Sequence, residues 1–303
     1  MPFDVDIREL TLAKQSPRVL EMLLTNKTTG GHLRWATDTY AQYGEGYHPA
    51  DEITTPRVLA HEGRVVTPRV SKAQDEQERR TKDKGEVFTP RQVCKSQNDL
   101  VDAAWFGIDP EGLYRNGAFA PPLDDGRRSW RRYVDKKVLE PACGEAPYLA
   151  DRYDVLTGEE IPLPDRAGLL DRKLDMVDVH ARTDDEWMKW AIRALEASYA
   201  YDIQGDNVLL ARENVLVSYL DHYEARFSKK ANLRILLKAA GRIAWNVFQM
   251  DGRTFDVPYE SVVDEDSVLF GEPVRKPVPS LIRDWRDCKG GTARPFRELI
   301  KAR

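Results

Sequence analysis

Three short apolar runs, each closing on an acidic residue, constrain the fold of this chain more than any other feature. They predict strands near residues 137–140, 198–203 and 243–250, which end at Glu140, Asp202 and Asp251. Patterns typical of helices lie between and around them, at residues 185–198, 206–223 and 231–241. Strands that alternate with helices form a parallel sheet with helices on its faces. Because ligands bind beyond the carboxyl ends of such strands, we expect the three acids to surround one ligand site.

The rest of the chain is more polar. We expect an N-terminal extension and linker over 1–84, followed by one main domain over 85–303 with a short, atypical C-terminal tail. Residues 71–84 carry no apolar face and fit either a solvated helix or a flexible linker. Further expectations are a helix over 93–105, a helix N-cap at Asp184, loops over 107–133 and 150–185, and a strand-like piece at 278–282.

Composition limits the class of protein. The chain has 303 residues, of which 41% are hydrophobic, enough for one large α/β domain. No stretch approaches the roughly 20 apolar residues that span a bilayer, and the acidic start lacks an apolar signal segment, so we expect a cytoplasmic protein without a membrane partner. Cys94, Cys143 and Cys288 are far apart, and no Cys/His cluster suggests a metal site or a disulfide scaffold.

The net charge of −4 does not favour a nucleic-acid-binding protein, but the basic residues are clustered. One basic run lies within 79–84 and another within 127–137. Each run fits either a solvated surface or a groove that faces DNA.

The first predicted strand leads into a motif of known type. The segment Leu139-Glu140-Pro141-Ala142-Cys143-Gly144-Glu145 resembles the first motif of the adenine-N6 DNA methyltransferases, an acid followed by Pro-Ala-Cys-Gly-x-Gly. The resemblance implies that Glu140, Pro141, Cys143 and Gly144 contact S-adenosylmethionine. A glycine turn allows close backbone approach, and an acid can pair with the methionine ammonium. The sequence departs from the motif at its second glycine, where Ala146-Pro147 stands.

Upstream, Gly85-Glu86-Val87-Phe88-Thr89-Pro90 resembles the Phe/Tyr-Thr-Pro element that precedes the first motif in this family. The resemblance implies that Phe88 and Thr89 help to cover the methionine end of the cofactor, and that Pro90 opens the next helix. Thr89 as N-cap with Pro90 in the first turn also fits helix physics independently.

Downstream, the segment from Tyr201 to Asn207 resembles the second motif of the family. There Asp202 would bind the ribose hydroxyls and Ile203 would pack on the adenine, since a carboxylate can accept from two vicinal hydroxyls. The segment 246–252 resembles the third motif, which implies a contact between Asp251 and the adenine amino group. The alternative for Asp251 is a turn aspartate, and N-capping of the following helix suits Asp206 better than Asp202.

The family's catalytic motif, Asn/Asp/Ser-Pro-Pro-aromatic, has no full copy in this chain. Its side chain accepts from the target amino group while the aromatic ring stacks on the flipped base. Two partial candidates remain, Asp256 with Tyr259 and Asp284 with Trp285. For each pair, the alternative is a turn or packing role.

The resemblance covers residues 80–256 and implies a Rossmann-like class I methyltransferase sheet with S-adenosylmethionine as cofactor. The function it implies is adenine-N6 methylation of DNA in a restriction-modification or phage setting, with DNA and a recognition subunit as partners. One alternative is an inactive relative that binds DNA or protein as a partner subunit. Another is a methyltransferase acting on RNA or protein. A Rossmann dehydrogenase is disfavoured because the chain has no GxGxxG.

Overall fold

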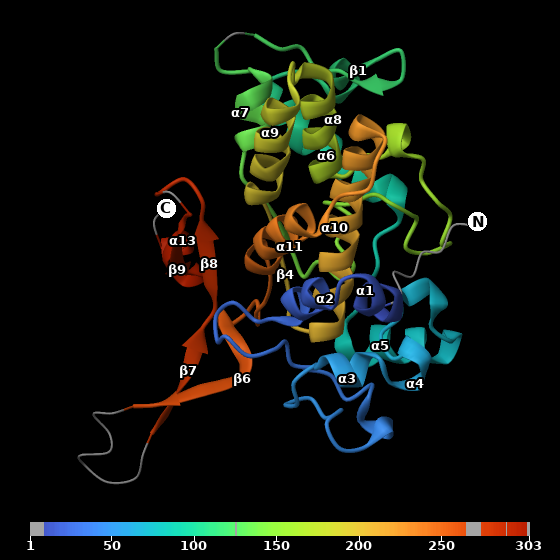
Figure 1. The fold of residues 1–303 in the computed structure, drawn as a ribbon, viewed down its shortest axis with the longest axis vertical. Coiled ribbons are helices and arrows are strands. Elements are labelled where there is room, and N and C mark those ends of the chain that lie inside the picture. The colour runs from blue at the N-terminus through green and yellow to red at the C-terminus, as the bar shows by residue number, and fades with distance from the viewer. Residues whose placement is uncertain (1–8, 125, 265–273, 289, 302–303) are drawn as a thin grey trace.

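The computed structural model describes residues 9–124, 126–264, 274–288 and 290–301. The helices are α1 Glu9–Gln15, α2 Pro17–Leu24, α3 Thr55–Val58, α4 Ala60–Gly63, α5 Gln74–Lys84, α6 Arg91–Phe106, α7 Trp130–Asp135, α8 Leu169–His180, α9 Asp184–Glu196, α10 Gly205–Phe227, α11 Leu233–Asn246 and α13 Phe296–Lys301. The strands are β1 Tyr114–Arg115, β2 Ala118–Phe119, β3 Val138–Pro141, β4 Ser198–Asp202, β5 Val247–Gln249, β6 Asp256–Val263, β7 Arg275–Pro279, β8 Leu281–Asp284 and β9 Thr292–Pro295. Figure 1 shows their arrangement.

The predicted parallel sheet is present. Strands β3, β4 and β5 pair in that order, all parallel, with Glu140 opposite Ala200 and Asp202 opposite Gln249. Short apolar strands of this kind are typical of parallel sheets that are covered on both faces. The chain is therefore a mixed α/β protein whose three-stranded sheet brings the ends of β3 and β4 together.

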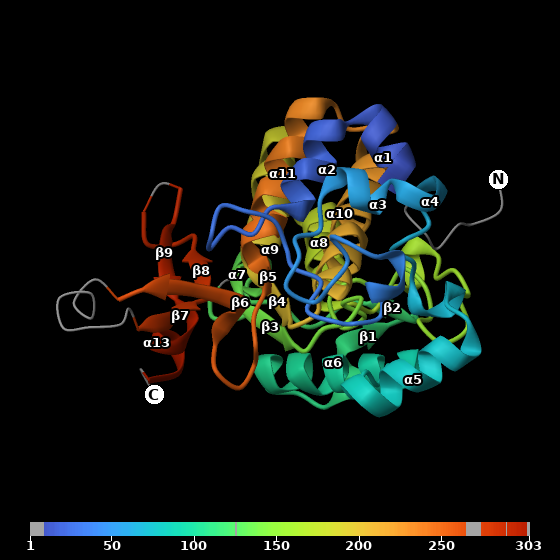
Figure 2. The same ribbon diagram turned by 90° about the horizontal axis from the view of Figure 1, so that it is seen from below.

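The two faces of the sheet have different covers. Side chains such as Val138, Ala200 and Val247 belong to the large core that includes α9, α10 and α11. Neighbouring positions such as Tyr199 and Phe248 face the opposite way, because side chains alternate along a strand, and join a second core with residues of β8, the turn after it and α13: Ile282, Trp285 and Phe296. The sheet thus lies between the helices and the C-terminal segment (Figures 1 and 2). The expectation of helices on both faces holds only in part, since one face is covered mainly by the β8–β9 hairpin.

One helix within the expected loop 150–185 was missed. Helix α8 carries the charged triplet Asp171, Arg172 and Lys173 at its buried face, so the segment looked like an exposed loop. Its charges are paired inside the protein: Arg172 bonds to Asp102 at 2.8 Å, and the Lys173 Nζ donates to the Ala197 carbonyl at 2.9 Å. Tertiary pairing therefore allows a charged helix face to be buried.

Other element boundaries differ by up to five residues, and the expected loop 107–133 contains β1, β2 and the start of α7. Helix α11 continues to Asn246, so the strand expected over 243–250 is reduced to β5. The N-cap of α9 is Thr183, whose side chain accepts from the Glu186 N–H at 3.2 Å, rather than Asp184. Pro90, not Thr89, is the N-cap of α6. The strand-like piece at 278–282 straddles β7 and β8.

Residues 9–84, expected to form an N-terminal extension and linker, share the large core and are also joined to the rest of the chain by a buried ionic network. Segment 71–84 contains helix α5, and its Arg80 reaches Asp206 of α10 at 2.8 Å and Glu86 at 2.6 Å. The Tyr40 hydroxyl also donates to Asp206, at 2.7 Å. Arg80 therefore belongs neither to a solvated surface nor to a DNA-facing groove, the two roles considered for its basic run.

No helix in the described part of the chain combines the length and apolar character that a bilayer crossing needs.

Replacing Arg80 should destabilise the folded protein. We expect Arg80→Ala to lower the free energy of unfolding by about 3–5 kcal/mol, because the buried Asp206 and the partly buried Glu86 lose their cation. The measurement is urea unfolding followed by circular dichroism. The neighbouring Arg79 is exposed on the same helix, so Arg79→Ala is the matched control and should leave the midpoint unchanged. Equal midpoints for the two variants would contradict the network.

Candidate functional site

A cavity of about 510 Å³ lies at the carboxyl ends of β3 and β4. That volume is within the range of small-molecule sites, roughly 300–1,000 Å³. Its walls come from the segment before α6, one side of α6, strand β3 with the turn after it, and the turn after β4, together with Leu169 of α8 and Asn207 of α10. The lining includes Glu86, Val87, Phe88, Thr89, Gln97, Asn98, Val101, Leu139, Glu140, Pro141, Ala142, Cys143, Gly144, Pro147, Tyr148, Asp202, Ile203, Gln204 and Asn207.

The turn after β3 is tight and is shaped by its backbone. Ala142, Gly144 and Ala146 all have left-handed φ values, of 46°, 52° and 60°. Glycine adopts such values without cost, whereas alanine does not. Ala146 thus holds a left-handed conformation that suits glycine better than alanine.

Two buried carboxylates hold this turn in place. Glu140 accepts from the backbone N–H groups of Tyr148 at 3.2 Å and Leu149 at 3.0 Å. Asp202 accepts from the N–H of Gly144 at 2.9 Å and, with its other oxygen, from the N–H of Gln204 at 2.9 Å. The acids at the ends of β3 and β4 therefore link the two strands through the turn that borders the cavity.

The same carboxylates remain available to a ligand. Burial raises the pKa of Glu140 to about 8 and that of Asp202 to about 6, although their backbone hydrogen bonds act in the opposite direction. Each carboxylate uses two acceptor positions on the backbone and retains others. Both groups line the cavity, where a cationic or hydroxyl-bearing ligand would favour their ionised forms.

The opposite wall is apolar and aromatic. The Phe88 ring lies against Gly144, where an added Cβ would come within 3.3 Å of it, and the guanidinium of Arg69 covers the ring at 4.9 Å. Ile203 is 41% exposed at the mouth, an unusual exposure for an isoleucine next to a buried strand. The cavity thus pairs a flat apolar surface with two acids.

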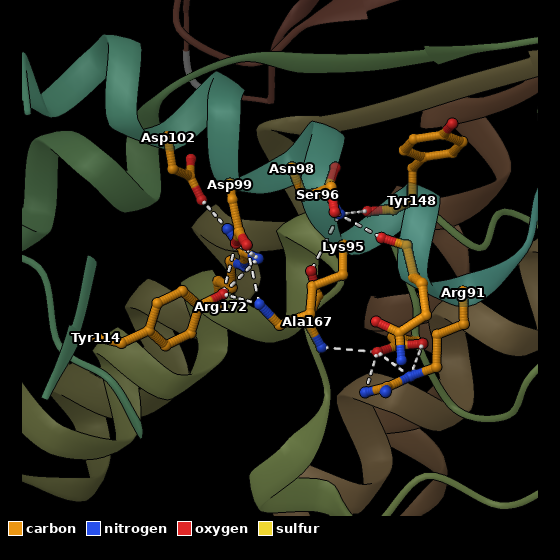
Figure 3. A network of polar contacts seen from close by, with 12 residues as sticks. Arg91, Lys95, Ser96, Asn98, Asp99, Asp102, Tyr114, Tyr148, Ala167 and Arg172 are labelled. Atoms are coloured by element: carbon orange, nitrogen blue, oxygen red, sulfur yellow. Dashed lines mark hydrogen bonds and ion pairs between the residues drawn. The ribbon is translucent and has the colours of Figure 1, made fainter. Parts of the chain in front are cut away.

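Helix α6 forms a fixed wall because its buried face is tied down by polar contacts, shown in Figure 3. Asp102 accepts from Arg172 of α8 at 2.8 Å, and Asn98 donates to the backbone carbonyls of Tyr148 and Ala167, each at 3.0 Å. At its first turn Arg91 pairs with Asp151 at 3.0 Å. The apolar residues Val93, Leu100 and Val101 of this helix are exposed, and Val101 lines the cavity.

Most of the residues predicted to bind a cofactor come together in this cavity. Those that line it are Phe88, Thr89, Glu140, Pro141, Cys143, Gly144, Asp202 and Ile203. Pro90 and Asp251 are not among the lining residues. Pro90 caps α6, while Asp251 lies two residues beyond β5 and accepts from the Arg253 N–H at 2.8 Å. Asp251 therefore has the turn geometry that was its alternative.

Sequence reasoning missed several polar residues of the cavity wall. Glu86 and Asn207 line the cavity and are bonded to each other at 2.8 Å, next to Arg80. Gln204 and Tyr148 also line it. Glu86 lies two residues before Phe88 and Asn207 five residues after Asp202, so proximity to the two motifs was the only signal available for them.

The four candidate catalytic residues lie outside the cavity. Asp256 pairs with Arg297, and Asp284 with Lys137 at 2.8 Å. Trp285 is buried in the second core, where its Nε1 donates to Asn246 at 2.7 Å, and Tyr259 is 60% exposed. Asp284 borders a separate cavity of about 360 Å³ between β3 and the C-terminal segment. Among the described residues, the acceptor and the stacking ring are therefore not assembled beside Glu140 and Asp202.

Comparison with known proteins gave no match: no family model fits the chain, and no curated protein or solved structure is significantly similar to it.

Gly144 offers a direct test of the turn. We expect Gly144→Ala to lower the free energy of unfolding by about 1–2 kcal/mol, because φ is left-handed and the new Cβ would press on Phe88. Gly241, inside α11, has open space around its Cβ position, so Gly241→Ala should instead raise it by about 0.5–1 kcal/mol. Chemical unfolding of both variants checks the prediction. A neutral or stabilising Gly144→Ala would show that the turn is not constrained.

Proposed function

We propose that the cavity at the ends of β3 and β4 binds S-adenosylmethionine. The observation that carries this proposal is the convergence of two buried acids, Glu140 and Asp202, with an exposed apolar side chain, Ile203, around one cavity of suitable size. Three separate sequence motifs supply these walls, each of which resembles a cofactor motif of the adenine-N6 DNA methyltransferases.

The donor set fits the chemistry of the cofactor. Glu140, in a buried position, would pair with the α-ammonium of the methionine moiety. Asp202 would accept hydrogen bonds from the two ribose hydroxyls, and Ile203 would pack on the adenine. Phe88 and Thr89 would border the methionine end. The sulfonium of the bound cofactor supplies an electrophilic methyl group, while the residues of this chain bind and orient it.

The proposed reaction is transfer of that methyl group to the N6 amino group of adenine in DNA, in a restriction-modification or phage setting and with a recognition subunit as partner. Support for this step is the motif resemblance alone. The role of the protein would be to exclude water around the sulfonium, since Phe88, Val101 and Leu139 give the cavity an apolar border.

A second function is favoured by one specific observation. The predicted acceptors Asp256 and Asp284 are engaged in ion pairs away from the cavity, and Trp285 is buried in a core. This arrangement supports a cofactor-binding relative that transfers nothing by itself and acts as a DNA- or protein-binding partner subunit.

Cofactor binding can be measured by isothermal titration calorimetry. Asp202→Ala should weaken S-adenosylmethionine binding by roughly 10- to 100-fold, because hydrogen bonds to a charged group are lost. Asp251→Ala is the matched control, since this acid was predicted to bind adenine but lies outside the cavity lining, and it should bind as the wild type does. Unchanged affinity in a folded Asp202→Ala variant, or strong weakening in Asp251→Ala, would contradict the site.

The same titration should depend on pH. Asp202 has a pKa of about 6 without ligand. Because the ribose hydroxyls favour the ionised carboxylate, affinity should fall as pH drops through this value, with about a tenfold rise in Kd between pH 7.5 and 5.0. The tenfold rise is the contribution of Asp202 alone, because Glu140, whose pKa is about 8, adds a further loss of affinity over the same range. The contribution of Asp202 should be absent in Asp202→Ala, and a pH profile identical to that of the wild type would exclude this carboxylate from the site.

Methyl transfer separates the two candidate functions. With radiolabelled S-adenosylmethionine and mixed-sequence DNA, an enzyme should label DNA, and Gly144→Ala should reduce the labelling. A binding subunit should instead bind the cofactor yet label no DNA, and Asp284→Ala and Asp256→Ala should then change nothing. DNA labelling that disappears in Asp284→Ala alone would restore Asp284 as the acceptor.

A further inference from the structure

Helices α8 and α10 enclose a second cluster of ionisable side chains, separate from the cofactor cavity. Asp171, Asp175 and Asp178 are spaced four and three residues apart, which places them on one face of α8. His222 comes from α10 and contacts this row, with its Nδ1 2.6 Å from an Asp178 oxygen and its Nε2 3.8 Å from an Asp171 oxygen. Three carboxylates and one imidazole therefore meet between two helices.

The second nitrogen of His222 has no hydrogen-bond partner among the described residues. The side chain is only 1% exposed, so water cannot readily satisfy it. Burial lowers the pKa of His222, but Asp171 and Asp178 outweigh burial and raise it to about 9, so the ring is protonated at neutral pH. The nearest acceptor, Asp171, is beyond hydrogen-bond reach and is already engaged by Ser218 at 2.6 Å. Nε2 therefore lies nearest to Asp171 without a full hydrogen bond, whereas the proton on Nδ1 lies between the ring and Asp178, and a metal ion that binds Nδ1 would displace that proton.

Asp175 is the second incompletely satisfied member of the cluster. It makes no hydrogen bond or ion pair to another part of the chain that the structure describes, whereas Asp171 and Asp178 are both bonded. Burial raises the pKa of Asp175 to about 7, and the nearby Asp171 and Asp178 add to this effect while His222 opposes it. One carboxylate oxygen each from Asp175 and Asp178 and one ring nitrogen of His222 all lie within 4.8 Å of one another.

Solvent can reach the cluster from one side. Asp175 also borders a polar cavity of about 500 Å³, whose walls include the acids Asp154, Glu160 and Asp165. A cation could therefore approach along an acidic surface, and a water molecule in this cavity could complete its coordination. Four basic residues border the same cavity, but each is paired with an acid: Arg91 with Asp151, Lys95 with Asp99, Arg166 with Asp221, and Arg172 with Asp99 and Asp102.

We propose that Asp175, Asp178 and His222 form a site for Zn²⁺ that joins α8 to α10. One imidazole and two carboxylates are ligands that zinc accepts, and a water molecule from the cavity supplies a fourth position. Nδ1 lies beside Asp178 and would be the nitrogen that binds the metal, while Nε2 lies toward Asp171, a carboxylate placed as the outer partner of a metal-binding histidine usually is. Asp178 and His222 are 44 residues apart in the chain, and the three ligands include no cysteine, which is why no metal site was expected from the sequence.

The test is titration of the full chain with Zn²⁺ by calorimetry, with thermal unfolding alongside. We expect one Zn²⁺ per chain with a Kd of about 10 μM or tighter and a raised Tm, because the metal binds the folded state. Asp175→Asn should weaken binding at least about tenfold, since a charged ligand is lost. Glu160→Gln is the matched control on the same cavity and should bind Zn²⁺ as the wild type does.

Two further variants keep the outcome interpretable. Cys288 is an exposed thiol, so Cys288→Ser should retain the binding if the proposed site is responsible. His222→Asn should lose it, and Asp175→Asn serves as the readout if His222→Asn does not fold. The proposal is overturned if the wild type shows no saturable Zn²⁺ binding, if binding disappears in Cys288→Ser, or if Asp175→Asn and Glu160→Gln bind equally.

Discussion

Two buried carboxylates bonded to backbone amides are the constraint on which the cavity depends. Glu140 holds the N–H groups of Tyr148 and Leu149, and Asp202 holds that of Gly144. These bonds bend the chain sharply after β3, and the bend requires left-handed backbone conformations close together. Glu140 and Asp202 therefore both hold the turn and line the cavity. Burial raises their pKa values, and a ligand that favours the charged form would lower them.

Buried charge is a recurring feature beyond the cavity. Arg80, Arg172 and Arg212 are almost fully buried, and each joins segments that are distant in sequence. Arg212, for example, donates to the carbonyls of Thr25, Ala244 and Val247, and so connects α10 to the N-terminal extension and to the end of α11. Such contacts stabilise only when all partners are present, because a buried charge left alone is costly. The walls of the cavity are consequently held by polar networks as much as by apolar packing.

The described part of the C-terminal segment contributes to the second core and not to the cavity. Instead of adding an acceptor and a stacking ring to the cavity, it covers the second face of the sheet with Ile282, Trp285 and Phe296. Burial of the indole in this core and its bond to Asn246 satisfy the only polar atom of that ring. The proposed cofactor site is therefore supported by residues that converge on one cavity. The proposed methyl transfer is supported only by the motif resemblance, which covers residues 80–256.

The sequence by itself determined the alternation of strands and helices, the position of β3 and β4, and the acids at their ends, because apolar periodicity and glycine turns are local properties. Eight of the ten predicted cofactor residues line one cavity for that reason. Only the tertiary structure decided that α8 is a helix with a charged buried face, that Arg80 is an anchor, and that Asp251, Asp256 and Trp285 lie elsewhere. These outcomes depend on partners far away in the chain, such as Asp102 for Arg172 and Asp206 for Arg80, and no local pattern encodes such a partner.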